Sequence, residues 1–129
     1  MKYDKVLDNG KNKKKFQTGG IREVASGKGR YDLLPTRAMR RLAEHYENGV
    51  HKYDDRNWEK GLPIGHYTDS ALRHTFKFLE GQTDEDHLAA AVWNLMCIME
   101  TMERIEIGML PKELMDLPAW QEYVKKKKI

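Results

Sequence analysis

The chain has 129 residues, of which 40% are hydrophobic and 33% are charged, and its formal net charge at pH 7 is +3. This length suits one domain with a modest core, and the composition excludes a disordered chain. No apolar run approaches the roughly 20 residues that span a bilayer, and the Lys-rich N-terminus lacks the apolar stretch of a secretory signal, so we expect a cytoplasmic protein with no membrane partner.

The first part of the chain is predicted to lack regular structure. Residues 1 to 20 are polar and rich in lysine, which is typical of a flexible basic segment, and a single domain is expected over residues 21 to 129. Residues 21 to 34 are predicted to form a loop with an apolar end. The lysine runs near the two termini are expected to be solvated tails.

Helices are predicted for most of the rest. The first opens at Pro35 and Thr36, the second spans about residues 69 to 80, the third ends near residue 107, and a short last one follows Pro118. No strand is predicted, and a loop separates the first two helices, so we expect an all-α helical bundle. The apolar stripes expected to face the core are Met39, Leu42, Ala43, Tyr46 and Val50, then Leu72, Phe76 and Leu79, then Leu88, Ala91, Val92, Leu95, Ile98 and Met102.

Polar residues form a strip beside each apolar stripe. Glu44 and Glu47 lie three residues apart on the first helix, so both carboxylates can approach one point. Such a pair repels itself unless a cation neutralises it, although pairs of this spacing are also common on solvated faces. The matching positions of the second predicted helix hold Asp69, Arg73 and Glu80. On the third predicted helix, His87 and Asn94 flank the apolar stripe. If the helices pack together, these strips can converge on one cavity.

The carboxylates of these strips suggest a divalent cation. Magnesium selects oxygen ligands, which Glu44, Glu47, Glu80 and Asp84 would supply. His87 would suit manganese better than magnesium, and the alternatives are that it acts as a base or donates a hydrogen bond to a phosphate. The expected cofactor is therefore Mg²⁺ or Mn²⁺.

Two segments combine cations with glycine or aromatic residues. In GKGRYDLLP, residues 27 to 35, glycines let backbone N–H groups approach a ligand, and Lys28 and Arg30 bring positive charge to a phosphate. The spacing of a Walker A loop is absent. In KYDDRNW, residues 52 to 58, an amide and two aromatic rings accompany two cations. The alternative interpretation is structural, with the rings capping the core and the charges forming ordinary ion pairs.

These segments resemble the MazZ-type dATP/dGTP diphosphohydrolases, which are small, mostly phage-encoded members of the all-α MazG-like nucleotide pyrophosphohydrolases. The similarity covers roughly residues 20 to 100, through the motifs GKGRYDLLP, LAEHYENGVHKYDDRNWEKGLP, ALRHTFKFLEG and HLAAAVWNL. The resemblance implies a MazG-like helical bundle with a long substrate-binding loop, assembled as a dimer or tetramer. For a phage protein, the location would be the host cytoplasm.

The resemblance also implies a reaction. Carboxylates would hold magnesium or manganese ions, and a metal-activated water would attack the α-phosphate of a purine deoxynucleoside triphosphate, dGTP or dATP, to release the monophosphate and pyrophosphate. Such enzymes supply dGMP for modified purine genomes or trim dNTP pools.

The resemblance assigns site residues one by one. Glu44 and Glu47 match the E-x-x-E of the MazG-like group, and Glu80 matches the acidic end of the second helix. The E-x-x-D of the following helix is replaced by DEDHLAAA, which leaves open whether Asp84, Asp86 or His87 completes the metal site. The implied catalytic residues are Glu44, Glu47, Glu80 and His87, and the implied metal ligands are Glu44, Glu47, Glu80 and Asp84. The residues implied for phosphate binding are Lys28, Arg30, Lys52, Arg56 and Arg73, and those for the base and sugar are Asn57, Trp58 and Asn94.

Two other classes of protein stay open at this point. A small nucleic-acid-binding helical protein would explain the basic tails, the pI near 8.9 and the aromatic residues among cations. Against it, acidic residues are mixed with the basic ones and the net charge is weak, so no stable nucleic-acid partner is expected. A structural helical adaptor would make the E-x-x-E pair surface decoration.

Overall fold

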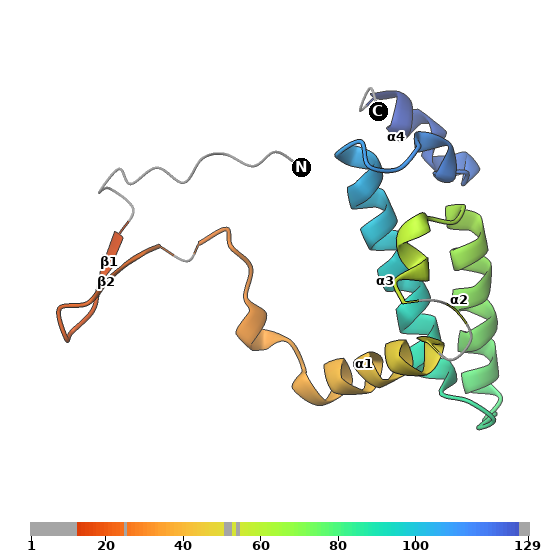
Figure 1. The fold of residues 1–129 in the computed structure, drawn as a ribbon, viewed down its shortest axis with the longest axis horizontal. Helices are drawn as coiled ribbons and strands as arrows, with labels where there is room; N and C mark the ends of the chain where they lie inside the picture. The colour runs from red at the N-terminus through yellow and green to blue at the C-terminus, as the bar shows by residue number, and fades with distance from the viewer. Residues whose placement is uncertain (1–12, 25, 51–52, 54, 127–129) are drawn as a thin grey trace. The chain divides into compact units, whose positions relative to one another are not determined.

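The computed structural model describes residues 13 to 24, 26 to 50, 53 and 55 to 126 of the chain. The chain divides after Pro35 into two parts, which are considered separately. The boundary expected near residue 20 lies inside the first part. The second part is helical, as predicted (Figure 1). None of the described helices is both long and apolar enough to cross a membrane.

The first part contains a β-hairpin, which corrects the expectation that this region has no strand. β1 (Lys13–Lys15) pairs with β2 (Ile21–Glu23) in antiparallel fashion. The turn is closed by the N–H of Phe16, which donates to the carbonyl of Gly20 at 2.8 Å, and Gly19 takes a φ of +89°, where glycine is favoured. All side chains of both strands are exposed, so no alternation of apolar and polar residues marked them in the sequence.

The second part is built on an antiparallel helical hairpin of α2 (Ile64–Leu79) and α3 (His87–Glu106) (Figure 1). The expected start of α2 near residue 69 was wrong, because α2 begins directly after Pro63. The backbone N–H of Gly65 donates to the carboxylate of Asp116 at 2.8 Å. This side chain caps α2 from 51 residues further along the chain, which a local pattern cannot reveal.

The buried face of the hairpin differs from the predicted stripes. Mostly short side chains at the contact let the two helix axes approach closely. The buried residues are Ile64, Tyr67 and Ala71 on α2, and His87, Ala89, Ala90, Ala91, Asn94, Cys97, Thr101 and Ile105 on α3. The expected core residues that are exposed in the single chain instead are Leu72, Phe76 and Leu79 on α2, and Leu88, Val92 and Leu95 on α3. These residues lie further round each helix than the positions that face the partner helix.

The first long helix, α1 (Thr36–Val50), packs across α3 near the turn of the hairpin (Figure 1). Leu42 is buried, and the rings of His45 and Tyr46 lie 6.2 and 6.0 Å from the ring of Trp93, measured between centroids. The aromatic cluster therefore fixes which face of α1 meets α3. Two residues expected on that face are exposed, namely Met39 and Ala43.

An ion pair ties α1 to the start of α3. The guanidinium of Arg41 donates to both carboxylate oxygens of Asp86, at 2.6 and 2.7 Å. Asp86 is also the N-cap of α3, because it accepts the backbone N–H of Ala89 at 3.0 Å. Arg41 is the main cause that lowers the pKa of Asp86 from 3.8 to about 2. One carboxylate thus serves both a helix end and a helix–helix contact.

Replacing Asp86 with alanine is expected to lower the free energy of unfolding by about 1–2 kcal/mol, because both the cap and the partly exposed ion pair are lost. Asp86→Asn should lower it less, since asparagine is an equally good N-cap. Because the folded pKa lies below the ordinary value, the contribution of the wild-type carboxylate is complete above about pH 4 and is lost as the pH falls toward 2. Urea unfolding at pH 7 and pH 3 tests this, and equal losses for both variants would contradict the capping role.

The apolar core of the second part lies at the end of the hairpin remote from the α2–α3 turn. There, η3 (Lys112–Leu114), η4 (Pro118–Trp120) and α4 (Gln121–Lys126) fold back on the helices, and the predicted last helix after Pro118 is confirmed. The core consists of Ile64, Ile105 and Met115, packed by Ile98, Met102, Leu110, Leu114, Leu117 and Val124. Polar groups are left to gather at the opposite end, around the turn.

Candidate functional site

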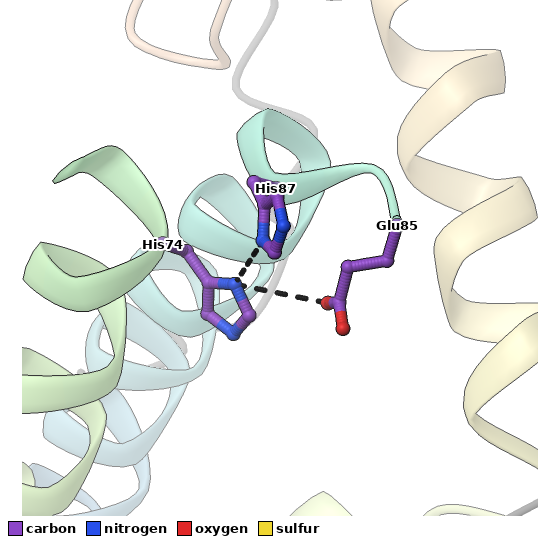
Figure 2. A group of neighbouring side chains, drawn as sticks. All are labelled: His74, Glu85 and His87. Carbon is purple, nitrogen blue, oxygen red and sulfur yellow. Dashed lines mark hydrogen bonds and ion pairs between the residues drawn. The ribbon is translucent and has the colours of Figure 1, made fainter. Parts of the chain in front are cut away.

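Titratable side chains meet where α2 ends and α3 begins (Figure 2). His74 reaches from α2 toward His87, the first residue of α3, and their Nδ1 atoms are 3.0 Å apart. Glu85 approaches from the turn, with its Oε1 3.7 Å from Nδ1 of His74. Asp84 lies on the other side of the His87 ring, with its Oδ1 2.7 Å from Nε2 of that ring. Four titratable groups thus form one connected cluster.

Asp84 determines which nitrogen of His87 carries a proton. A carboxylate can only accept, so Nε2 of His87 donates to it, and this hydrogen bond is the main cause that lowers the pKa of Asp84. With Nε2 as the donor to Asp84, Nδ1 of His87 is the ring nitrogen that can accept, and a proton on Nδ1 of His74 is placed to be donated to it across 3.0 Å. Burial lowers the pKa of His74, which favours its neutral form. The cluster is a directed chain of hydrogen bonds.

The same side chains can hold a divalent ion. One ligand atom from each of His74, Glu85 and His87 lies within 4.8 Å of the other two. Of the His, Cys, Asp and Glu residues that the structure describes, these three are the ones close enough together to share an ion. The predicted ligand Asp84 stands beside this group, in contact with His87.

The other predicted carboxylates are exposed. Counted at 100° per residue, Glu44 and Glu47 lie about 150° round α1 from the face formed by Leu42, His45 and Tyr46. Glu80 is the C-cap residue of α2 and is also exposed. Within the described part of a single chain, these carboxylates and Asp84 are not gathered round one point. Their joint role as ligands stays a prediction.

The predicted phosphate-binding cations are exposed, and each described one has a nearby carboxylate. Exposed ion pairs contribute only about 0.2–1 kcal/mol, so the polyanionic end of a nucleotide can compete for these cations. Lys52 lies outside the described residues. The pairs are Lys28 with Glu23 at 3.4 Å, Arg30 with Asp32 at 2.8 Å, Arg56 with Glu59 at 2.9 Å, and Arg73 with Asp69 at 3.1 Å.

The GKGRYDLLP segment begins as a loop, as expected, and its second half contains a short 3-10 helix, η1 (Tyr31–Leu33). Gly27 and Gly29 have φ values of +85° and +86°, so a side chain at either position would strain the backbone. Both glycines are therefore required by the loop's conformation, and the cations between and after them are presented on exposed backbone.

The residues predicted for the base and sugar lie in different environments. Asn57 and Trp58 begin η2 (Asn57–Lys60) and are half-buried, with the guanidinium of Arg104 5.2 Å from the centroid of the Trp58 ring. Asn94 is buried within the hairpin and donates from Nδ2 to the carbonyl of Ala90 at 2.8 Å. These contacts are structural ones in the single chain, and base recognition by the three residues stays a prediction.

His74 and Glu85 were missed by the sequence analysis. His74 lies three residues after Ala71 and seven after Tyr67, so it belongs to the buried side of α2. A titratable residue on that side, with a second histidine 13 residues later across a short turn, was the available signal. It was weak, because a histidine on an apolar side of a helix is usually a core residue, and only the packing of α2 on α3 brings the two rings together.

Comparison with known proteins agrees with the motifs. The family model described as dATP/dGTP diphosphohydrolase, N-terminal, matches residues 18–109. No curated protein and no solved structure matches the chain significantly. The matched residues run from the start of the glycine-rich region to just beyond α3, and they include all the motifs on which the resemblance rested. This all-α, MazG-like chain therefore belongs to the dATP/dGTP diphosphohydrolase, N-terminal, family.

Proposed function

We propose that the protein hydrolyses a purine deoxynucleoside triphosphate, dGTP or dATP, to the monophosphate and pyrophosphate, with Mg²⁺ or Mn²⁺ as cofactor. The observation that carries this proposal is the family match over residues 18–109, which include every proposed catalytic residue. The product would be dGMP or dAMP, available for a modified-base pathway or removed from the dNTP pool.

Carboxylates are the proposed metal ligands. Glu44 and Glu47 are three residues apart on α1 and are exposed, so their oxygens are open to an ion, and Glu80 and Asp84 are the proposed additions to the set. Oxygen donors of this kind suit Mg²⁺. A bound divalent ion supplies charge neutralisation for the triphosphate and a water of lowered pKa.

His87 is the proposed catalytic group of α3. Its ring is buried and is oriented by the 2.7 Å hydrogen bond from Nε2 to Asp84. The remaining nitrogen, Nδ1, is the atom that can take part in chemistry, either by accepting a proton or by ligating an ion. Held in this way, the ring needs little reorganisation when it acts.

The proposed phosphate-binding groups are the exposed cations, and the proposed groups for the base and sugar contain amide and indole side chains. The cations can exchange the carboxylates of their weak surface ion pairs for the more highly charged triphosphate. The phosphate set is Lys28, Arg30, Lys52, Arg56 and Arg73, and the base and sugar set is Asn57, Trp58 and Asn94.

Replacing Lys28 with alanine is expected to raise KM about tenfold with little change in kcat, because one charged contact to the bound phosphates is lost. Steady-state kinetics of pyrophosphate release measures both constants. Lys112→Ala is the matched control, since Lys112 is also an exposed lysine but lies beyond the matched residues. An unchanged KM for Lys28→Ala would remove this lysine from the phosphate site.

The reaction itself is tested by product analysis. The protein is incubated with each dNTP and NTP, with Mg²⁺ or Mn²⁺, and the products are separated. Pyrophosphate with dGMP or dAMP is expected, whereas inorganic phosphate with a diphosphate would contradict the proposal. Binding to DNA or RNA that weakens steeply with salt, without hydrolysis of any nucleotide, would favour the nucleic-acid-binding alternative.

We also propose that the protein is a homo-oligomer, because one side of the helical hairpin is uncovered and apolar. This apolar face consists of Leu72, Phe76 and Leu79 on α2, and Leu88, Val92, Leu95 and Met99 on α3. Its most exposed members are Leu79 and Phe76, which are 71% and 61% exposed in the single chain. Soluble monomers rarely expose contiguous apolar patches of this kind.

The placement of α1 leaves the apolar face free. At 100° per residue, its α3 members lie about 130° round the helix from Trp93, against which α1 packs. On α2 and on α3, the apolar-face residues are rotated about the helix axis in the same direction, away from the residues that contact the other helix. Because the two helices are antiparallel, this places both sets of residues on the same side of the hairpin. Two such hairpins from two subunits would pack as a four-helix bundle, and an apolar surface is complementary to its own copy.

A further inference from the structure

We propose that His74, His87 and Glu85 form a binding site for a transition-metal ion of the Zn²⁺ type at the α2–α3 turn. The site differs in its ligands from the all-carboxylate set proposed for Mg²⁺. Ion binding at this site does not depend on whether a deoxynucleoside triphosphate is the substrate.

The spacing of the donor atoms fits such an ion. Bonds from Zn²⁺ to imidazole nitrogen are about 2.0–2.1 Å long, which places neighbouring ligand atoms of a tetrahedral site about 3.3–3.4 Å apart. The two observed distances from Nδ1 of His74 bracket this value, at 3.0 Å to Nδ1 of His87 and 3.7 Å to Oε1 of Glu85 (Figure 2). Small rotations of the side chains would bring all three atoms to bonding distance. The proton that Nδ1 of His74 donates in the metal-free cluster would move to Nε2 of that ring, so that Nδ1 offers its lone pair to the ion.

Asp84 provides the independent support for a ligand role of His87. Histidines that bind metal usually donate their other ring N–H to a carboxylate, which orients the ring and makes it a better ligand. His87 has this arrangement, with Nε2 bonded to Asp84 at 2.7 Å and the lone pair of Nδ1 directed at His74. Its side chain is 1% exposed, so the ring is held in this orientation by the surrounding helices.

The charge and exposure of the cluster also suit a dication. Glu85 and Asp84 bring two negative charges. The cations near His74 are Lys77 and Arg73, and Arg73 is paired with Asp69, so the surroundings of the two rings keep a net negative charge. The His74 side chain is 16% exposed and that of Glu85 is 43% exposed, so an ion can enter from the side of the turn where Glu85 lies. Three protein ligands leave a fourth position of a tetrahedral site open.

The ligand types determine which ion is favoured. Two imidazoles with one carboxylate are typical of sites for Zn²⁺, Co²⁺ and similar borderline ions, whereas Mg²⁺ and Ca²⁺ are held by oxygen atoms. The alternative is that the two rings simply share a proton in a structural hydrogen bond, in which case no ion binds here.

The test is a metal titration of the full chain, freed of chelatable metal, without a histidine tag and without nucleotide. Co²⁺ is added first, because its visible absorption reports nitrogen ligation, and Zn²⁺ is then added to displace it. We expect one saturable set of visible bands in wild type, which Zn²⁺ removes and millimolar Mg²⁺ does not, because Mg²⁺ competes with Co²⁺ for the carboxylate set and not for nitrogen ligands. His74→Asn and Glu85→Gln should each weaken Co²⁺ binding about 100-fold or more, and Asp84→Asn about 10–100-fold.

His66→Asn is the matched control, because His66 is an exposed histidine on the same helix, α2. It should bind Co²⁺ as wild type does. Circular dichroism confirms that each variant is folded, and Glu85→Gln keeps the test decisive because this exposed side chain is not needed for packing. Unchanged Co²⁺ affinity in His74→Asn, or displacement of Co²⁺ by Mg²⁺ at millimolar concentration, would overturn the proposal. A wild-type protein that hydrolyses no dNTP in the product assay but binds Co²⁺ at these residues would contradict the proposed function and support the metal site.

Discussion

Replacing Glu44 or Glu47 with glutamine is expected to abolish pyrophosphate release while leaving the protein folded. Glutamine has the shape of glutamate but no charge, so it is a poor ligand for a hard cation. A catalytic ion is worth several kcal/mol in the transition state, and 1.36 kcal/mol corresponds to a tenfold change in rate, so a loss of roughly 10³-fold or more is expected.

Stability should be almost unaffected, because both side chains are exposed and lie away from the face of α1 that packs on α3. Exposed substitutions of this kind usually change the free energy of unfolding by less than about 0.5 kcal/mol. Pyrophosphate release and thermal unfolding measure the two effects separately. Glu103→Gln, which changes an exposed glutamate on α3, is the control and should keep full activity.

If both variants turn over substrate at nearly the wild-type rate, the assignment of the metal to α1 is wrong. The ion would then have to be held without these carboxylates, and the cluster of His74, Glu85 and His87 would be the place to look for it. Loss of activity accompanied by unfolding would show instead that the pair supports the structure.

Helical periodicity was sufficient to predict most of the fold, but not its boundaries. The end of α3 and the short helix after Pro118 follow from local signals, and both were predicted. The start of α2 was not, because Asp116 caps it from a distant part of the chain. The β-hairpin was missed because exposed strands carry no alternating pattern, and pairing of their backbones is what defines them.

The candidate site could be predicted only in part, for a related reason. The E-x-x-E pair is a local feature, since residues three apart on a helix are neighbours in any fold. The contact of His74 with His87 depends on the rotation of α2 against α3, which no single segment determines. His87 and Asp84 were predicted from the sequence, but His74 and Glu85, which complete the cluster, were not.

Apolar stripes showed a different limit. Periodicity indicates that Leu72, Phe76, Leu88 and Leu95 face something apolar, but it does not say whether the partner is the same chain. The structure leaves these residues uncovered and buries mainly small side chains between α2 and α3. A second copy of the hairpin, the partner that we propose, would reconcile the sequence pattern with the packing.

Replacing Leu95 with glutamate is therefore expected to convert the oligomer into a folded monomer. Leu95 is 51% exposed in the single chain, so the new carboxylate is solvated there and the helical hairpin keeps its own contacts. In the assembled apolar face the same carboxylate would be buried without a partner, which is strongly unfavourable. The molar mass from light scattering should fall to that of one chain, while the helical circular dichroism stays unchanged.

Met109→Glu is the control for this prediction, because Met109 is similarly exposed but lies beyond α3 and outside the apolar face. It should keep the mass of the wild-type assembly. A Leu95→Glu variant that also keeps that mass would show that the subunits meet elsewhere, and a monomeric wild type would remove the assembly altogether. If pyrophosphate release is lost together with the assembly but not in the control, the active site needs the second subunit, which would explain why one chain alone does not gather the four predicted carboxylates.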